Sequence, residues 1–167
     1  MQGGQFQVDF TELTPENANK TGVDRIDFMI SANPGQPLQP LSKVASGGEL
    51  SRMSLAIQVV THNKSSIPCL IFDEVDVGIG GGTAEIVGNL LRELAQRAQV
   101  LCVTHQAQVA AKGAQHFSVS KSTLAQKTLT QITQLDTEQR TEEIARMIGG
   151  IEITDQTRKF AKEMLKG

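Results

Sequence analysis

Two adjacent carboxylates, Asp73 and Glu74, follow directly on the short apolar run Cys69–Phe72. A continuous apolar run of this length is typical of a strand that is covered on both faces. Successive side chains at a strand end point in different directions. One carboxylate could therefore hold Mg²⁺, directly or through water, while the other polarises a water that attacks a γ-phosphate, as in a Walker B arrangement. Either residue taken singly would be an ordinary polar strand end.

A second group, Ser46-Gly47-Gly48-Glu49, stands before an apolar pattern with helical spacing. Ser46 and Glu49 match a capping box, which stabilises the start of a helix. The capping box does not explain the two glycines, because a glycine within a helix costs about 1 kcal/mol relative to alanine. Glycines leave backbone N–H groups bare at the positive end of the helix dipole, where a phosphate could approach. The motif predicts a capped helix start that could also contact a phosphate.

Four elements must position these residues. Helical spacing of the apolar side chains predicts one helix over residues 50–61 and another over 84–94, with Thr83 as the N-cap of the second. Apolar runs predict strands over 69–72 and 100–104. Strand, helix and strand form a βαβ unit, whose right-handed crossover makes the two strands parallel.

His105 follows the second of these strands at once. Parallel strands end at the same edge of a sheet, so Asp73, Glu74 and His105 should meet at the carboxyl edge, where open α/β sheets place their ligand sites. A histidine after a strand is by itself an ordinary surface or core residue. In this position it becomes a candidate sensor of the γ-phosphate.

The rest of the chain predicts peripheral elements. Antiparallel strands are expected near residues 6–10 and 25–31, joined by a polar loop. An edge hairpin is expected from 116–121 and 128–135, followed by two helices over 138–148 and 154–165. The fold class is therefore α/β, a parallel sheet core flanked by helices with an antiparallel edge hairpin, and we expect one compact unit.

Composition narrows the class of protein. The formal net charge is −2 and the pI is near 5.9, which argues against a lobe that binds nucleic acid mainly through its own charge. The sequence lacks an apolar run near the roughly eighteen residues of a membrane span and has no signal segment at its start, so we expect a soluble, cytoplasmic protein. Cys69 and Cys102 lie within apolar runs and are expected to be buried, reduced thiols.

Together the motifs resemble those of ABC-type ATPases. In order along the chain, residues 45–49 resemble the signature motif, 69–74 the Walker B motif, 75–78 the D-loop and 104–105 the switch histidine. The strings NPGQPLQPLSKVASGGELSRMSLAIQVV and LIFDEVDVGIGGGTAEIVGNLL resemble the RecN family, bacterial SMC-like ATPases of DNA repair, more closely than any transporter. The likeness continues through VLCVTHQAQVAAKGAQHFSVSK and loosely to the C-terminus, so it covers nearly the whole chain.

One motif of that family is absent. The 167 residues contain no G-x-x-x-x-G-K-[ST] phosphate loop (Walker A) and no heptad array. In the family, the phosphate loop belongs to an N-terminal lobe that a long coiled coil separates from the C-terminal lobe. The resemblance therefore implies that residues 1–167 are the C-terminal lobe of a P-loop NTPase head of the ABC/SMC type. Residues 1–40 would form strands and a loop, 41–121 the motif-bearing core, and 122–167 an edge strand and the C-terminal helices.

The resemblance also implies a site shared between two heads of a homodimer, which sandwich two ATP molecules. The signature motif of one head would reach the γ-phosphate that is bound mainly by the other head. The residues that would contact this nucleotide in trans are Ser46, Gly47, Gly48 and Glu49.

The other motifs would serve the nucleotide of their own head. By resemblance, Asp73 would hold Mg²⁺, Glu74 and His105 would be catalytic, and Asp76 of the D-loop would communicate across the dimer. The cofactors would be ATP and Mg²⁺, and the partners would be the N-terminal lobe, the second head and, for the full-length protein, DNA. The family couples hydrolysis to double-strand break repair and recombination, and a protein engaged on DNA would associate with the nucleoid. This chain alone would be inactive.

Two other interpretations stay open. The chain could be a non-catalytic assembly or DNA-docking module, for which a basic patch around Lys121 and Lys127 would speak. It could also be the corresponding lobe of another SMC-like or Rad50-like head. Arg52 could belong to the functional face of the signature helix, or it could form an ion pair with Glu49 three residues earlier.

Overall fold

The chain divides into two compact units, residues 1–46 and 47–167. The computed structural model describes residues 4–20, 22–31, 35–44, 46–61, 67–124, 127–150 and 152–167, without the side chains of residues 44, 123, 124 and 127. The sequence predicted one compact unit. The structure differs because the first unit forms an antiparallel sheet of its own, and the boundary falls inside the Ser46–Glu49 motif.

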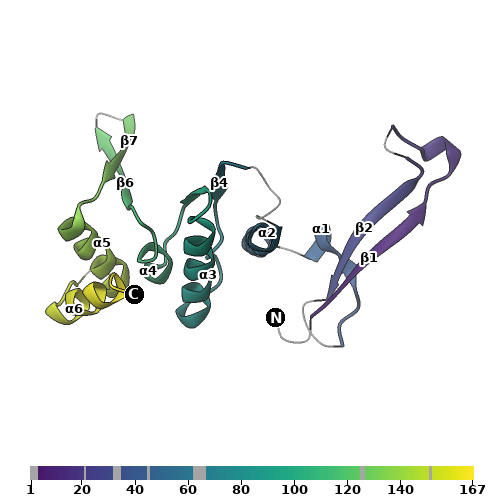
Figure 1. Cartoon of the computed structure of the whole chain (residues 1–167). Coiled ribbons are helices and arrows are strands. Elements are labelled where there is room, and N and C mark those ends of the chain that lie inside the picture. Colours follow the sequence, from purple (N-terminus) through teal and green to yellow (C-terminus); the bar gives the residue numbers. More distant parts are fainter. Residues whose placement is uncertain are drawn as a thin grey trace. The chain divides into compact units, whose positions relative to one another are not determined.

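The first unit is built on a long two-stranded ribbon (Figure 1). Strands β1 (Gln5–Glu12) and β2 (Asp24–Ser31) pair antiparallel, as predicted, and the short β3 (Gln39–Pro40) pairs with β2 ahead of helix α1 (Leu41–Val44). The polar segment between β1 and β2 includes a 3₁₀ helix, η1 (Pro15–Asn17). The pairing register places apolar side chains opposite one another, such as Val8 opposite Phe28, and so gives the ribbon one apolar face.

The second unit contains the predicted βαβ motif (Figure 1). Helix α2 (Gly47–Thr61) comes first, followed by β4 (Cys69–Phe72), α3 (Gly81–Leu94) and β5 (Gln99–Cys102), and β4 and β5 are parallel. Thr83 is not the N-cap of α3, because the helix begins two residues earlier and Gly80 occupies the cap position. Thr83 therefore lies in the first turn.

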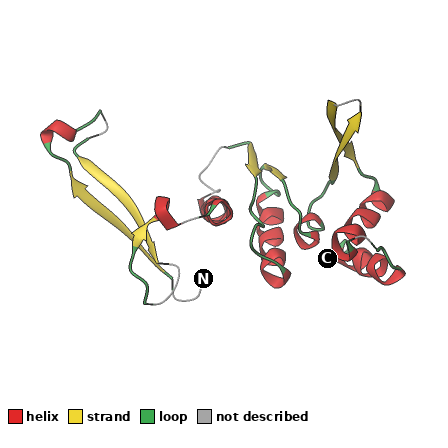
Figure 2. Cartoon of the chain, turned by 180° about the vertical axis from the view of Figure 1, so that it is seen from behind, coloured by secondary structure: helices red, strands yellow, loops and turns green. Residues whose placement is uncertain are grey.

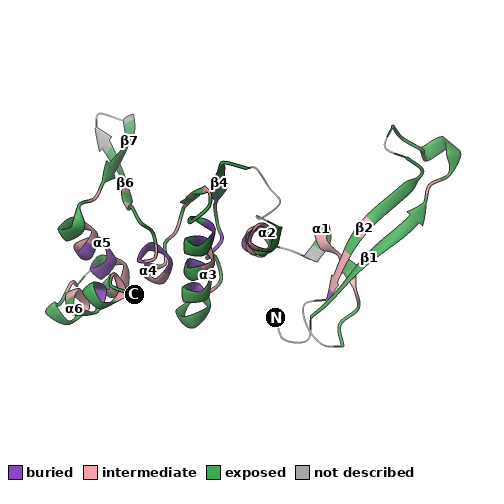
Figure 3. Ribbon diagram, in the orientation of Figure 1, coloured by how far each residue is buried: buried purple, intermediate pink, exposed green. Residues whose placement is uncertain are grey.

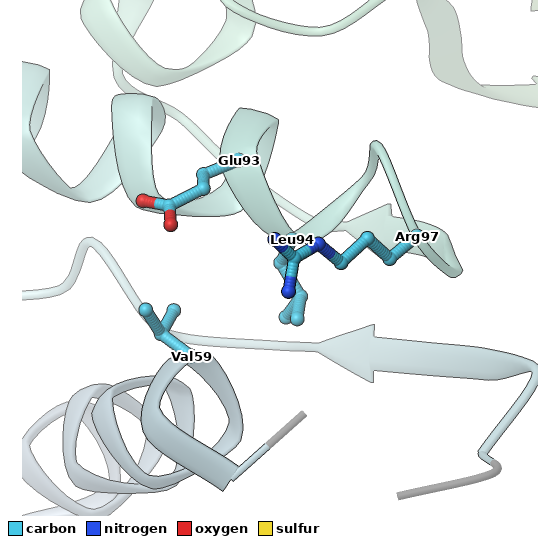
Figure 4. Close-up of a pocket in the computed structure, with 4 residues that line it drawn as sticks. All are labelled: Val59, Glu93, Leu94 and Arg97. Carbon is cyan, nitrogen blue, oxygen red and sulfur yellow. The ribbon is translucent and has the colours of Figure 1, made fainter. Parts of the chain in front are cut away.

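Helices α2 and α3 pack with the two parallel strands around one core. Its fully buried members include Leu55, Phe72, Val75, Val87 and Leu91. Figure 3 shows the buried stripe along α3. At the end of this packing, Val59 of α2 lies near Leu94 and Arg97, and these residues, with Glu93, line a hollow of about 10 Å³ (Figure 4). A hollow of that size holds about one water molecule, so it is no ligand site.

The parallel strands are covered on one face rather than on both, contrary to the sequence prediction. Ile71 is 71% exposed and Val103 is 62% exposed, because their side chains point away from the face on which α2 and α3 pack. Cys69 is exposed for the same reason, since it lies two residues from Ile71 on β4 and shares its face. Cys102 is partly buried, and both cysteines are free thiols, as predicted.

The hairpin and the last two helices form as predicted, but in the described part of the chain the hairpin does not pair with the parallel strands as an edge, and the short helix after β5 was not predicted. Strands β6 (Phe117–Leu124) and β7 (Lys127–Gln134) form an antiparallel hairpin with a sheet of its own, and α5 (Thr137–Gly149) and α6 (Asp155–Met164) pack together (Figure 2). The short helix α4 (Ala107–Ala110) joins this region to β5 and contacts both α3 and α5. No helix among the described ranges is long and apolar enough to cross a membrane.

Candidate functional site

The ends of β4 and β5 meet at one edge of the parallel pair. Phe72 is paired with Cys102, and the backbone N–H of Val103 donates to the carbonyl of Phe72 at 2.9 Å, which extends the ladder beyond both strands. Asp73 and Glu74 follow β4 at this edge, and His105 follows β5. The structure therefore brings together the three residues that the sequence placed here, while their chemical roles stay predictions.

Asp73 and Glu74 are exposed at a sharp turn of the backbone. Glu74 has a φ of 59°, in the left-handed region that residues other than glycine rarely adopt. The Oδ1 atom of Asp73 accepts the N–H of Glu74 at 2.9 Å, which braces the turn from inside. Such backbone strain persists only where neighbouring contacts impose it, and it is found most often at functional sites.

Negative charge gathers behind this turn. Burial, and to a smaller extent the carboxylates of Asp76 and Asp73, raise the pKa of the Cys102 thiol to about 12. Mg²⁺ is commonly held by one or two carboxylates together with substrate phosphates, and the exposed Asp73 stays the predicted ligand. Among the described residues, no cluster of three or more His, Cys, Asp or Glu side chains could hold a metal without such phosphates.

The first turn of α2 lies directly against the loop that follows β4. A Cβ atom on Gly48 would come within 3.0 Å of the backbone carbonyl oxygens of both Glu74 and Val77. A Cβ atom on Gly47 would come within 2.3 Å of Oε2 of Glu74. Gly48 thus has a structural reason within its own chain, which is the close approach of the helix start to this loop. Gly47 faces only the end of the exposed Glu74 side chain, which could move aside.

Two side chains of α2 fasten it to the same loop, and the sequence reasoning missed both contacts. The hydroxyl of Ser51 donates to the carbonyl of Asp73 at 2.5 Å. The guanidinium of Arg52 donates to the carbonyls of Val75 at 3.3 Å and Val77 at 2.8 Å, where an ion pair with Glu49 had been considered. Both side chains hold the backbone on either side of the strained Glu74.

Asp76 points into the protein. It is 1% exposed, and its Oδ2 atom accepts the hydroxyl of Thr104 and the backbone N–H groups of His105 (3.1 Å) and Gln106 (3.2 Å). Its Oδ1 atom lies 3.4 Å from Nδ1 of His105. The expected communication across a dimer stays a prediction, and the buried carboxylate could contribute to it only through the loop that it holds.

A larger hollow, of about 330 Å³, lies away from this edge, at the base of the hairpin. Its lining includes His116 and Arg140. Burial lowers the pKa of His116, the charge of Arg140 lowers it further, and Glu143 opposes the shift. None of the residues predicted to contact a nucleotide lines this hollow.

Comparison with known sequences gives one consistent result. The chain is 54% identical to the DNA repair protein RecN of Vibrio cholerae and 52% identical to that of Haemophilus influenzae, over 99% of its own length in each case. It is 42% identical to RecN of Bacillus subtilis over 91% of its length. It spans 30%, 29% and 26% of the lengths of these three proteins, respectively. No family model matches the chain.

Comparison with solved structures supports the fold class. The Smc head domain of Pyrococcus yayanosii matches 86% of this chain with a TM-score of 0.58 at 19% identity, over 26% of its own chain. The Smc head of Pyrococcus furiosus, solved with the C-terminal domain of ScpA, matches 88% of this chain with a TM-score of 0.55 at 18% identity, over 34% of its own chain. At these identities the likeness concerns the fold, which is that of an SMC head lobe.

Proposed function

We propose, starting from the membership of this chain in the RecN family, that it is the C-terminal lobe of an ATPase head that acts in DNA repair. The lobe would supply the signature motif and the Walker B carboxylates, and it would be inactive without a second lobe that carries a phosphate loop. The observation that carries the proposal is the edge at the ends of β4 and β5, where Asp73, Glu74 and His105 are brought together. The missing phosphate loop supports the division of labour between two lobes.

The residues at this edge fit the proposed reaction. Asp73 would hold Mg²⁺, which neutralises the phosphate charge when it is bound. Glu74 would orient the attacking water and accept its proton, and His105 would contact the γ-phosphate. The backbone of Glu74 is fixed on both sides by Ser51 and Arg52. These hydrogen bonds support a catalytic role for Glu74, because a small displacement of a catalytic carboxylate would lower the rate of ATP hydrolysis.

The signature motif would act on a nucleotide held by another head. Ser46, Gly47, Gly48 and Glu49 stand at the start of α2, and Gly47 is exposed there, so its backbone N–H lies where an anion could approach. A solved structure with the same fold, described as concerning ATP-driven dimerization and DNA-stimulated activation of SMC ATPases, has a TM-score of 0.53 to this chain. By analogy, ATP would close two heads of this protein around DNA, and hydrolysis would release them.

The experiment that tests the proposal measures ATP turnover by the purified chain, first alone and then with the phosphate-loop lobe of the parent protein. We expect none for the chain alone and clear turnover for the mixture. Glu74→Gln should abolish turnover but preserve ATP-induced dimerisation, whereas Glu163→Gln, at an exposed position on α6, should change neither. Turnover by the chain alone, or full activity of Glu74→Gln in the mixture, would overturn the proposal.

A further inference from the structure

Both ring nitrogens of His105 are engaged by neighbouring side chains, although the ring is 63% exposed. The Nδ1 atom lies 3.4 Å from Oδ1 of Asp76, and the Nε2 atom lies 3.2 Å from Nε2 of Gln106. A neutral imidazole carries one N–H donor and one acceptor nitrogen. The two partners therefore decide which nitrogen holds the proton.

The side-chain amide of Gln106 has a fixed orientation. Its Nε2 atom donates to the carbonyl of Ile79 at 3.0 Å, and this carbonyl can only accept. If the amide were turned over, its oxygen would face the Ile79 oxygen, and two acceptors would meet without a proton between them. The –NH₂ group must consequently point toward both Ile79 and His105, and its second hydrogen needs an acceptor at Nε2 of the ring.

Asp76 favours the same tautomer of His105 through its contact with the other ring nitrogen, Nδ1. Its carboxylate already accepts three hydrogen bonds from Thr104, His105 and Gln106, so it acts as an acceptor in this loop. The Nδ1–Oδ1 contact at 3.4 Å is electrostatic rather than a hydrogen bond, and the negative charge of Asp76 attracts an N–H at Nδ1 and repels a lone pair there. Two independent contacts thus favour one tautomer, with the proton on Nδ1 and the lone pair on Nε2.

We propose that Gln106 and Asp76 are positioning residues that hold His105 in the Nδ1–H tautomer, with its Nε2 lone pair occupied by the Gln106 amide. The meaning of this arrangement for the reaction rests on the proposed function. Phosphate oxygens accept hydrogen bonds, so a histidine that contacts a γ-phosphate through Nε2 must carry a proton there. The His105 ring would have to leave Gln106 and then either exchange its Nδ1 proton for one at Nε2 through water or take a second proton from water before it could donate to ATP. Gln106 therefore keeps the sensor disengaged while no nucleotide is bound.

The test is the tautomeric state of His105 in the 167-residue chain without nucleotide. Long-range proton–nitrogen correlation NMR on ¹⁵N-histidine-labelled chain, at a pH where the rings are neutral, distinguishes a protonated from an unprotonated ring nitrogen. The chain has three histidines, and single His→Gln variants assign their signals. We expect His105 to be mainly the Nδ1–H form in the unsubstituted chain.

The substitution Gln106→Met removes the amide and keeps a side chain of similar length. We expect the Nδ1–H share of His105 to fall in this variant, because only the contact with Asp76 then favours that tautomer. The other two histidines should keep their signals. Gln96→Met, at an exposed position after α3, should leave all three unchanged. A dominant Nε2–H form in the unsubstituted chain, or an Nδ1–H share that is unchanged in folded Gln106→Met, would overturn the proposal. Because no nucleotide is present, either result is independent of whether the assembled head hydrolyses ATP.

Discussion

Glu74 is the residue on which the proposed chemistry depends most, and its backbone shows how that residue is placed. Among the residues that the structure describes, it is the one non-glycine position with a positive φ. The left-handed conformation turns the chain sharply after β4, so that Asp73 and Glu74 stay exposed while Val75 and Asp76 turn inward. The hydrogen bonds from Ser51 and Arg52 offset the strain, which is typically of the order of 1–3 kcal/mol.

The two cysteines should differ in reactivity. The pKa of the Cys102 thiol is raised to about 12, chiefly by burial, so at neutral pH and even at the ordinary thiol pKa of 9.0 it stays protonated. The thiolate is the reactive form, and Cys69 is exposed. We expect iodoacetamide to modify Cys69 in the folded chain and to spare Cys102, as measured by peptide mass spectrometry. A Cys69→Ser chain should remain unmodified until it is denatured, and rapid labelling of folded Cys102 would contradict this account.

The buried glycine of α2 should be intolerant of any side chain. In Gly48→Ala the added Cβ would meet two carbonyl oxygens at 3.0 Å, and overpacking of this kind typically costs about 1–3 kcal/mol. Gly82→Ala is the matched control, since it lies in the first turn of α3 with no atom within 4 Å of its Cβ position. It should raise the free energy of unfolding by up to about 1 kcal/mol. Urea denaturation distinguishes the two, and equal stabilities would refute the close approach of α2 to the loop.

At the scale of helices and strands, the sequence predicted most of the elements. It did not predict which faces of those elements are buried. Apolar spacing predicted both parallel strands and the helices, because period and length are local properties. The uncovered face at Ile71 was missed, since a four-residue apolar run looks the same whether one face or two are packed within the chain. The start of α3 was missed by three residues, since Gly80, not Thr83, takes the cap position.

The position of the candidate site could be predicted from the sequence, but the contacts that hold its loops could not. The shared edge of Asp73, Glu74 and His105 followed from βαβ topology, which the sequence pattern encodes. The inward turn of Asp76 and the contacts of Ser51 and Arg52 could not be predicted, because they depend on how α2 and the loop after β5 approach the loop after β4. Contacts between segments that lie more than twenty residues apart leave no periodic signal.

The hydrogen bonds of Arg140 should be the main polar interactions that hold α5 against the end of α4. Its guanidinium donates to the carbonyls of Ala110 and Ala111 at 3.3 and 3.1 Å, to Ala114 at 3.3 Å, and to Gly113. These are carbonyls at and beyond a helix end, which lack intrahelical partners. We expect Arg140→Met to lower the free energy of unfolding by about 1.5–3 kcal/mol, the range for hydrogen bonds to a charged group.

Thermal denaturation of Arg140→Met beside Arg158→Met checks this prediction. Arg158 pairs with Glu142 and Asp155 at the surface of the α5–α6 pair, where ion pairs contribute little. Its loss should therefore lower the melting temperature much less than the loss of Arg140. Equal effects of the two substitutions would show that the bonds from Arg140 to the carbonyls after α4 do not stabilise the fold.

At the scale of the whole molecule, the chain is shorter than its relatives and its parallel strands are covered on one face only. It spans about 30% of the length of the curated relatives that it matches first, and its parallel strands leave an apolar face exposed at Ile71, Leu101 and Val103. Parallel sheets in complete α/β domains are covered on both faces. Under the proposed function, a second lobe outside these 167 residues would supply the phosphate loop and complete the nucleotide site.

The central claim, that the signature motif of one head serves ATP held by the other, is tested most directly by mixing two inactive heads. Each head is this chain joined with the phosphate-loop lobe. One carries Ser46→Arg and the other carries Glu74→Gln, so each homodimer has two defective sites. A mixed dimer contains one site with an intact Glu74 and an intact opposing Ser46. We predict that mixing restores ATP turnover, and a mixture that dimerises but stays inactive would contradict the account.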